Sequence, residues 1–549
     1  MRDLLSNRWH DSKLAQAALL FGLVFALFLP SARYEQLNLD DDIYVMNNTR
    51  MREGLTPKNV GWALTSVGYA CNWHPLAWTS LMADVSLVRL LDGGRQIGED
   101  EWRRKGNSVA HVMHFHNVCL HAFNAVLLFL LIAKLLDGKF SAVWPLGLAL
   151  LWAVHPLRVE VVCWISERKE LLCCTWMLLA VMFYVQIRPL GPGRYAAALG
   201  CAILAMLAKP VAVTLPAVLL AWDWIFGGRV RWLRLLPFGF LSAGTCLLTM
   251  MAQTDAIGSG REMGRLSQIR TIFAGPIIYV RQTLWPTGLS IAYEGRMDLL
   301  ALVEMLMGVL LVVLLVALCI WWLKRRSQVL GILTFAVSWV YVGLVPMLGI
   351  VKVGGQEHSD RYTYWIGCGL CVSLALLAKV CVPQFEKWFI RKTDGGVKGY
   401  GDLRQAAFYG MFAVVVVWGA LSINRMKVWR DTATLYRDAI PKSWCTEIAF
   451  ALVGELINTG AQGLQESEMW LRACLKHCPS INGTLNLVDI LRRKPVDGCA
   501  AMFGQPCHDE ALLLLEGVLA QEPGNVRAKT LLAIIEGENR KARRNVQGQ

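Results

Sequence analysis

Long apolar segments alternate with short polar stretches along most of the chain, and this pattern decides the fold class. A membrane-spanning helix needs roughly 20 mostly apolar residues, and about eleven segments approach that length. They lie near residues 13–30, 116–136, 141–155, 171–187, 195–208, 211–227, 235–252, 299–323, 328–350, 363–382 and 406–423. The pattern predicts an all-α polytopic membrane protein.

Basic residues collect in every second connection between these segments. Connections of this kind face the cytoplasm under the positive-inside rule. The clusters are Arg2, Arg8 and Lys13; Arg188 and Arg194; Arg229, Arg231 and Arg234; Lys324, Arg325 and Arg326; and Lys387, Arg391, Lys392, Lys398 and Arg404. All five share one face if the N-terminus is cytoplasmic. The loop 31–115 and the region 424–549 then lie on the extracytoplasmic face.

The region 424–549 changes from apolar segments to amphipathic helical patterns separated by Pro441, Pro479 and Pro523. Paired helices with a proline near the end of each pair are typical of tetratricopeptide repeats. We predict a degenerate repeat domain of two to three units, which would offer a concave surface to a protein or peptide. A plain helical domain that only stabilises the rest of the chain is the alternative.

Composition agrees with the membrane assignment. The chain has 549 residues, 55% of them hydrophobic, and a mean hydropathy of +0.41, which is too apolar for an ordinary soluble enzyme. The formal net charge of +14 is explained by cytoplasmic loops. No nucleic-acid-binding motif accompanies it. The first apolar segment lacks a small-residue cleavage site and is interpreted as a retained anchor.

Most of the 16 cysteines lie in apolar segments and are interpreted as packing residues. The spacing does not predict a structural zinc site. Five cysteines lie in the C-terminal region, where an oxidising compartment would allow disulfides. These are Cys445, Cys474, Cys478, Cys499 and Cys507. A Cys499–Cys507 bond would close an insertion, but the sequence leaves the pairing open.

Three consecutive carboxylates, Asp40, Asp41 and Asp42, follow the first apolar segment. Like charges this close raise the pKa of at least one carboxyl group unless a cation relieves them. Such a group at a membrane boundary is a candidate general base or metal ligand. The alternative is a solvated loop with no chemical role.

Further polar motifs recur at the predicted extracytoplasmic boundary. They contain His74; His114, Asn117 and His121; His155, Arg158 and Glu160; Glu167, Arg168 and Lys169; Lys209; Trp285; and Gln356, Asp360 and Arg361. Ionisable residues at such depths are costly and are commonly functional. Any single one is better explained by a structural ion pair or a snorkelling side chain. Because the whole group is predicted to lie on one face, it favours a functional site there.

The ordered motifs resemble one family. They are Asp40-Asp41-Asp42-x-Tyr44-Val, Asn-Trp-His74-Pro-Leu, His114-x-x-Asn117-x-x-x-His121, His155-Pro-x-x-x-Glu160 with Trp-Ile-x-Glu-Arg168-Lys169, Ala-Lys209-Pro, Leu-Trp-Pro-Thr-Gly and Asp360-Arg361-Tyr-Thr-Tyr. The chain is similar to bacterial multi-span proteins with C-terminal tetratricopeptide repeats. Those proteins are similar in turn to the eukaryotic transmembrane and tetratricopeptide-repeat-containing O-mannosyltransferases. The resemblance covers about residues 13–540, and the irregular repeats depart from the family pattern.

The resemblance implies a GT-C-type glycosyltransferase in residues 1–423. Such enzymes move a sugar from a polyprenyl-phosphate lipid to an acceptor on the extracytoplasmic side. Asp40 and Asp41 match the acidic pair of the first outer loop, and Tyr44 follows as in related members. The mannose donor and the protein or peptide acceptor are expectations from the eukaryotic relatives only.

The chemistry of this transfer gives each of these residues a hypothetical role. Asp40 is the first choice for the base that takes the acceptor proton and Asp41 the second, with Asp42 orienting one of them. A cation must hold the departing phosphate. The candidates are Arg158, Arg168, Lys169, Lys209 and Arg361, with Arg168 or Arg361 preferred because arginine suits phosphate. His155 and Glu160 would position the acceptor or pair with these cations. Asp40, Asp41 and Glu160 could also ligate a divalent metal, which the sequence leaves open.

Two other functions remain open at this point. One is a transporter or flippase for lipid-linked sugars, which would place its charges at the membrane midplane. The other is a glycan ligase or polymerase of the same fold. The resemblance favours a bacterial inner membrane, with the endoplasmic reticulum membrane as the eukaryotic equivalent.

Overall fold

The computed structural model describes residues 12–137, 143–185, 191–254, 265–293, 299–348, 358–392, 396–443, 446–494 and 507–547. Throughout these ranges the regular structure is helical and no strand occurs. The chain forms two compact units. The first unit is Met1–Leu289 with Gly295–Arg430, and the second unit is Ser290–Glu294 with Asp431–Gln549. The predicted boundary after residue 423 lies within the last turn of the helix that ends the first unit.

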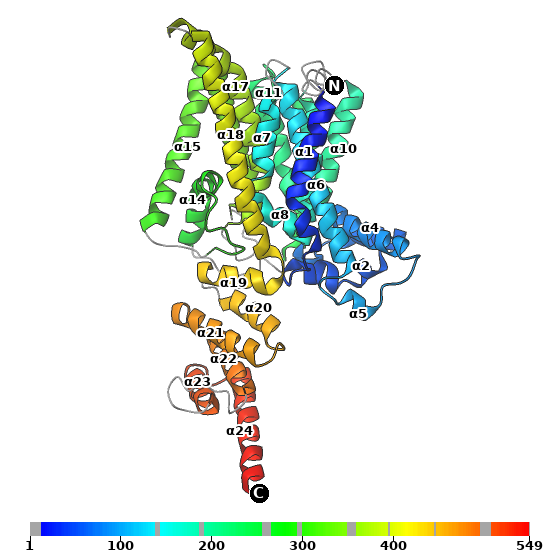
Figure 1. Ribbon diagram of the computed structural model, residues 1–549, viewed down its shortest axis with the longest axis vertical. Coiled ribbons are helices and arrows are strands. Elements are labelled where there is room, and N and C mark those ends of the chain that lie inside the picture. Colours follow the sequence, from blue (N-terminus) through cyan, green and yellow to red (C-terminus); the bar gives the residue numbers. More distant parts are fainter. Residues whose placement is uncertain are drawn as a thin grey trace. The chain divides into compact units, whose positions relative to one another are not determined.

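Each of the predicted apolar segments forms a helix in the first unit (Figure 1). These helices are α1 (Lys13–Phe28), α6 (Ser108–Leu135), α7 (Val143–Ala153), α9 (Arg168–Tyr184), α10 (Pro192–Ala208), α11 (Leu215–Ile225), α12 (Trp232–Ala252), α15 (Leu299–Arg325), α16 (Gln328–Leu344), α17 (Thr363–Lys392) and α18 (Gly396–Met426). The all-α prediction is therefore confirmed for the described part of the chain.

Seven of the described helices are long and apolar enough to cross a membrane, or eight if a bent pair is one span. The bent pair is Val143–Ala153 with Pro156–Cys163, which meet at 58°. This number is lower than the predicted eleven because α9 and α10 have only 17 residues and α11 has 11. At 1.5 Å per residue, about 17 residues fall short of the ~30 Å hydrocarbon core. The long helices indicate an integral membrane protein.

Hydrogen-bonded caps and prolines fix where these helices begin. The Ser12 hydroxyl accepts from the Ala15 N–H at the start of α1, and the Asn107 side chain accepts from the Ala110 N–H at the start of α6. Pro192 occupies the first position of α10, where its missing N–H costs nothing. Helix α6 is largely buried and packs against α1, α7 and α9, whereas α15 exposes leucine and valine over most of its length. Exposed apolar side chains on a long helix indicate contact with lipid.

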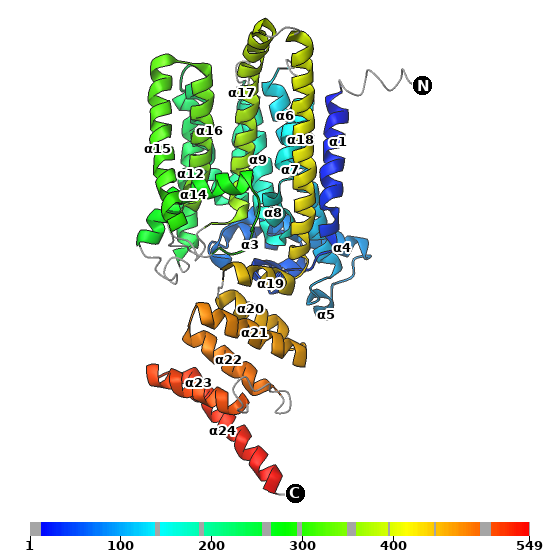
Figure 2. The same cartoon turned by 60° about the vertical axis from the view of Figure 1, so that its left-hand side comes forward.

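The first unit has two chemically different ends, which Figure 2 shows. The described basic residues of the connections α11–α12, α15–α16 and α17–α18 lie at the end where α1 begins. The opposite end carries the aspartate triplet and four short helices that the apolar pattern did not predict. These are α2 (Thr49–Glu53), α3 (Pro57–Thr65), α4 (Pro75–Leu91) and α5 (Glu99–Trp102). Two more helices, α8 (Val159–Cys163) and α14 (Arg265–Leu284), lie toward the same end.

The second unit is a series of helices in which neighbours in sequence pack on one another. They are α19 (Thr432–Ser443), α20 (Thr446–Leu456), α21 (Ala461–His477), α22 (Ile481–Arg493), α23 (Cys507–Gln521) and α24 (Val526–Gln547). Ser480 caps α22 by accepting from the Gly483 N–H. Cys474 is buried and Cys478 exposed, whereas Cys445, Cys499 and the Cys507 side chain lie outside the described residues. The disulfide predictions therefore stay predictions.

Candidate functional site

Asp41 is buried and its carboxylate is fully engaged. One oxygen accepts hydrogen bonds from the Ser166 N–H at 2.9 Å and the Ser166 hydroxyl at 2.5 Å. The other accepts from the Leu37 N–H at 3.1 Å. Burial raises the pKa of Asp41 to about 6, although these hydrogen bonds oppose the increase. Asp41 thus fastens the first loop to the turn Ile165–Glu167 and does not face solvent.

Asp40 has the opposite surroundings, because its side chain is 46% exposed. Its carboxylate lies 3.2 Å from the Lys169 ammonium group. Asp42 is half-buried, and its side chain accepts the neighbouring Ile43 N–H at 2.9 Å as the short helical turn Asp42–Met46 begins. Burial raises the pKa of Asp42. Of the three carboxylates, Asp40 combines exposure with a fixed cationic neighbour.

Lys169 is the buried cation that connects the triplet to the rest of the cluster. Its ammonium group lies 3.3 Å from Glu167 and stacks over the rings of Tyr44 at 4.9 Å and Trp164 at 5.5 Å. The aromatic faces stabilise a positive charge that has little contact with water. Tyr44 is held in turn by a 2.9 Å hydrogen bond between its hydroxyl and His74 Nδ1.

Glu167 is the centre of the cluster and was not assigned a role from the sequence. Besides Lys169, it lies 3.1 Å from Lys209 and 3.5 Å from Arg361. Burial alone would raise the pKa of Glu167, but Lys169, Lys209 and Arg361 together outweigh burial and hold that pKa below its usual range. One buried carboxylate therefore gathers three cations, two of which, Lys209 and Arg361, come from distant parts of the chain.

Two further carboxylates complete the cluster. Glu160 pairs with Arg361 at 2.5 Å, and Glu170 pairs with Lys209 at 2.7 Å. Arg361 also lies over the rings of Trp164 at 5.3 Å and Tyr362 at 5.1 Å. We call the group Asp40, Glu160, Glu167, Lys169, Glu170, Lys209 and Arg361 the ionic cluster. It brings five of the sequence-predicted site residues into one connected network.

Arg168 lies next to this cluster in sequence but points elsewhere. Its guanidinium group donates to the Asn117 side chain, the Ser80 hydroxyl, the Asp84 carboxylate and the Met113 carbonyl at 2.5–2.9 Å. The side chain is buried. Arg168 thus joins α4, α6 and α9, with Asp84 as a partner that the sequence did not single out.

Arg158 is also buried, but it lies among aromatic groups. It donates to the Thr363 hydroxyl at 3.1 Å and lies 5.6 Å and 5.5 Å from the ring centres of Trp152 and Tyr364. No carboxylate of the described residues forms an ion pair with it. A Cβ at Gly367 would lie 3.2 Å from its guanidinium group, so a glycine suits this position.

The predicted histidines bind mainly to backbone groups and to tyrosines. His155 accepts the Leu157 N–H and therefore donates from Nε2 to the Thr283 carbonyl at 2.9 Å. His114 contacts the Glu35 carbonyl, and His121 contacts the Tyr364 hydroxyl and the Ala153 carbonyl. Asp360 is buried at the start of the turn before α17. These contacts describe how the helices are joined around the cluster.

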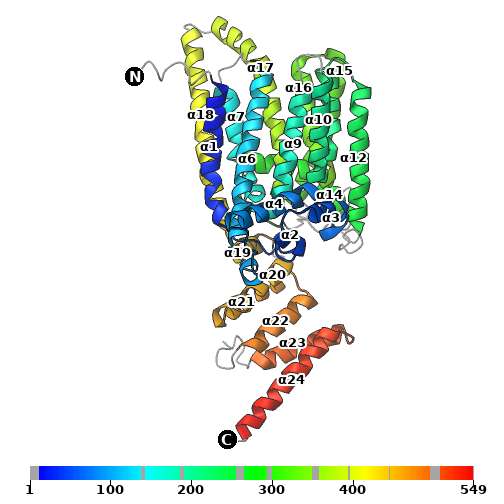
Figure 3. The same cartoon turned by 90° about the vertical axis from the view of Figure 1, so that its right-hand side faces the viewer.

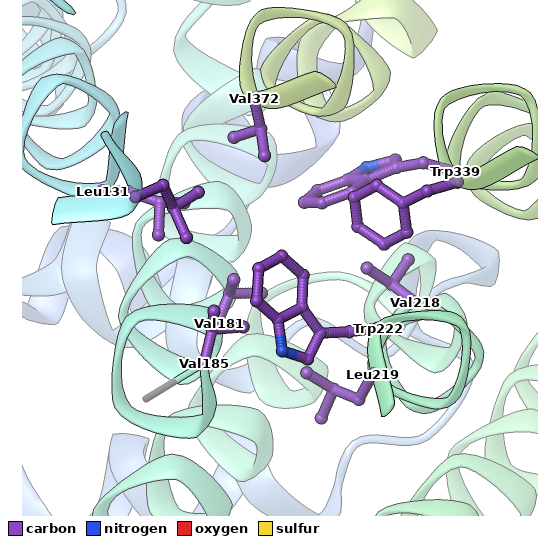
Figure 4. A pocket seen from close by; sticks show the side chains of 10 residues that line it. Leu131, Val181, Val185, Val218, Leu219, Trp222, Trp339 and Val372 are labelled. Carbon is purple, nitrogen blue, oxygen red and sulfur yellow. The ribbon is translucent and has the colours of Figure 1, made fainter. Parts of the chain in front are cut away.

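Among the described residues, no group of three His, Cys, Asp or Glu side chains has the arrangement of a metal site. An apolar cavity does occur elsewhere in the first unit (Figure 4). Leu131, Val181, Leu219, Trp222, Trp339 and Val372 line it, and its volume is about 10 Å³. This is about the minimum for one water molecule, and apart from the indole rings of Trp222 and Trp339 the lining is aliphatic or phenyl. The cavity is a packing gap rather than a ligand site.

No protein-family model matches the sequence, and no curated protein matches it. The assignment of a function therefore depends on the geometry of the ionic cluster and on the sequence motifs.

Proposed function

We propose that the protein is a membrane glycosyltransferase that takes a sugar from a polyprenyl-phosphate donor and transfers it to an acceptor hydroxyl. The observation that carries this proposal is Asp40, a half-exposed carboxylate held 3.2 Å from a buried lysine at one end of a helical membrane unit. Glycosyl transfer from a phosphate needs a base and a cation close together. The resemblance to the GT-C-type O-mannosyltransferases supports the same reaction.

In this mechanism Asp40 is the general base. The acceptor oxygen attacks the anomeric carbon while its proton passes to the Asp40 carboxylate. The bond between the anomeric carbon and the phosphate oxygen breaks, and its electron pair leaves with the phosphate. Asp41 cannot take this role in the observed arrangement, because it is buried and both of its oxygens accept hydrogen bonds. Asp41 instead holds Asp40 in place.

Lys169 and Arg361 are the proposed phosphate ligands. Both belong to the ionic cluster, and the Arg361 side chain is the more exposed, at 12% against 7%. Glu167 forms ion pairs with three cations. When Lys169 or Arg361 binds a phosphate, the charge of Glu167 is therefore still compensated by Lys209. Arg168 has four hydrogen-bond partners in the protein and is proposed as a positioning residue.

The second unit is proposed to bind the protein or peptide acceptor. Its consecutive packed helices support the tetratricopeptide-repeat interpretation. We also propose an extracytoplasmic location for this unit and for the ionic cluster, in the inner membrane of a bacterium.

The test is a transfer assay with the full-length protein in lipid nanodiscs. Polyprenyl phosphates carrying mannose, glucose or N-acetylglucosamine are each supplied with a pool of serine- and threonine-containing peptides. Mass spectrometry then follows the gain of one sugar on a peptide. Transfer from at least one donor supports the proposal. A parallel assay in sealed proteoliposomes follows the donor itself, and its transport across the bilayer without any transfer would contradict the proposal and favour a flippase.

A further inference from the structure

An apolar groove lies between α10 and α12 in the first unit. Its volume is about 550 Å³, within the range of small-molecule sites. Leu199, Ile203 and Met206 line it from α10, and Phe240, Leu241 and Leu248 line it from α12. Figure 3 shows these two helices side by side, with α12 on the outside. None of the residues that line this groove has been given a role in the proposed reaction.

The groove has no free polar side chain to offer an occupant. Thr245 is a lining residue, but its hydroxyl donates to the Leu241 carbonyl within α12 at 2.9 Å. Trp73 also lines the groove, and its indole N–H donates to the Leu64 carbonyl at 3.1 Å. Such a surface suits hydrocarbon. Phe240 and Leu247 are 74% and 64% exposed, so the outer side of α12 is as apolar as a lipid-facing helix requires.

One end of the groove leads toward the ionic cluster. Met206 and Leu207 line the groove, and Lys209 follows them at the end of α10. The Lys209 ammonium group lies 3.1 Å from Glu167, the carboxylate that also holds Lys169. A molecule with an apolar chain in the groove and an anionic head at this end would place that head beside Lys209, where it would compete with Glu167 and with Glu170, which lies 2.7 Å from the same ammonium group.

Trp73 reaches the groove from a strained turn of the first loop. Ala70 and Cys71 have φ values of 53° and 54°, in the left-handed region that side chains disfavour. A hydrogen bond from the Tyr69 hydroxyl to the Ile43 carbonyl, at 2.9 Å, holds the turn. The residue after Trp73 is His74, which binds the Tyr44 hydroxyl under Lys169. The turn therefore ties the groove to the cluster, and strain of this kind concentrates at functional sites.

We propose that the α10–α12 groove holds the hydrocarbon chain of an isoprenoid phosphate, with Trp73 against the units next to the phosphate. The identity of the lipid as a sugar donor rests on the proposed function. The position of the hydrocarbon chain is inferred from the groove, Trp73 and Lys209. In this arrangement the chain enters sideways from the bilayer between α10 and α12, and the phosphate lies toward Lys169.

Gly244 and Gly239 of α12 provide a matched pair of variants. A Cβ at either position would meet open space, so neither Gly244→Leu nor Gly239→Leu introduces a clash at the first side-chain carbon. Only Gly244 lines the groove. The full-length protein in nanodiscs is titrated with a long-chain polyprenyl phosphate that carries no sugar, and binding is followed by native mass spectrometry. We expect Gly244→Leu to weaken binding by roughly tenfold or more and Gly239→Leu to leave it unchanged.

Competition experiments distinguish binding through the hydrocarbon chain of the lipid from binding through its head group. Farnesyl phosphate should displace the long lipid, whereas inorganic phosphate and phosphatidylglycerol should not. A lipid that carries a photoreactive group beside the phosphate should label peptides that contain Trp73. Equal displacement by phosphatidylglycerol would show a site for bulk lipid and overturn the proposal. Equal binding by the two glycine variants, or labelling away from α10, α12 and Trp73, would also overturn it.

The same experiments distinguish this inference from the proposed reaction. Lipid binding that is lost only in Gly244→Leu, in a protein that transfers no sugar, supports the groove and contradicts the transferase. Sugar transfer with the same KM for the donor in Gly244→Leu and the unchanged protein supports the transferase and contradicts the groove.

Discussion

Asp40 and Asp41 are neighbours in the chain but have opposite surroundings at the scale of single residues. Both carboxylate oxygens of Asp41 accept hydrogen bonds, from Ser166 and from the Leu37 N–H, whereas Asp40 has an exposed carboxylate beside Lys169. Two adjacent residues of the same type therefore divide positioning and chemistry between them. The sequence alone could rank these carboxylates, but it could not separate their roles.

Asp40→Asn is expected to reduce sugar transfer by roughly 10²–10⁴-fold, because the amide cannot accept the acceptor proton. Its ion pair with Lys169 is partly exposed, so the loss should cost at most about 1 kcal/mol of stability. The transfer assay and the thermal unfolding temperature measure the two effects. Asp42→Asn is the control and should keep most of the activity. Full activity in Asp40→Asn would assign the base elsewhere.

The pKa of Asp41 predicts how stability changes with pH. The carboxyl titrates near its ordinary value of about 3.9 in the unfolded chain and at about 6 in the folded protein. The folded state holds more protons between these values, so stability should fall as the pH rises through this window and level off above it. A shift of about two pKa units corresponds to roughly 3 kcal/mol.

Asp41→Asn should remove this slope, because the amide does not titrate. The melting temperatures of both proteins, measured in detergent between pH 4 and 7, provide the comparison. The variant should also melt below the unchanged protein at pH 4, since an amide nitrogen cannot accept the Leu37 N–H. Parallel curves for the two proteins would show that another group controls the pH dependence.

Helix α9 is the element that organises the site. Its first residues point to three different places: Arg168 to Asp84 of α4, Lys169 to Asp40 of the first loop and Glu170 to Lys209 after α10. Successive side chains of a helix point about 100° apart around its axis, so three consecutive residues can contact three different neighbours. Charges that would be costly singly in a membrane protein are thus compensated around one helix end.

Close helix contacts predict a second effect at the scale of elements. A Cβ at Gly308 of α15 would lie 1.8 Å from the Phe273 carbonyl oxygen of α14, whereas a Cβ at Gly410 of α18 would meet open space. Gly308→Ala should force α15 away from α14 and cost about 1–3 kcal/mol. Thermal unfolding of Gly308→Ala and Gly410→Ala measures the difference. A Gly308→Ala protein as stable as Gly410→Ala would contradict this packing.

The apolar helices could be predicted from sequence because a membrane span is a local property of about 20 residues. The short helices α2 to α5 were missed since their apolar residues face a small core around Trp78 and Trp102 and form no long segment. The partners of the charged residues were not predictable either. Arg168 and Asp84 are 84 residues apart in the chain, and Arg361 and Glu160 are 201 apart. Such pairs are decided by helix packing.

At the scale of the whole membrane unit, the first unit places two groups of charged residues at opposite ends. The basic connections lie at the end where α1 begins, and the ionic cluster lies at the other. We expect alkaline phosphatase fused after residue 549 to be active in a bacterial host, because this enzyme folds only outside the cytoplasm. A green fluorescent protein inserted at residue 395 should be fluorescent, since the proposed topology places this connection in the cytoplasm. The reverse pattern would invert the proposed topology.

The long-range pairs of the ionic cluster set a condition on biosynthesis. Asp40 meets Lys169 across 129 residues, and Glu160 meets Arg361 across 201. A nascent chain enters the membrane from its N-terminus. Asp40 of the first loop therefore has no ion-pair partner until α9 is made, and Glu160 has none until the chain reaches the start of α17. Until then, carboxylates and cations of the future site lack their partners beside the bilayer. A chain synthesised only as far as residue 360 therefore contains nine of the eleven apolar helices but still lacks α17, α18 and the cation that pairs with Glu160, so its site is incomplete while most of its apolar helices are already made.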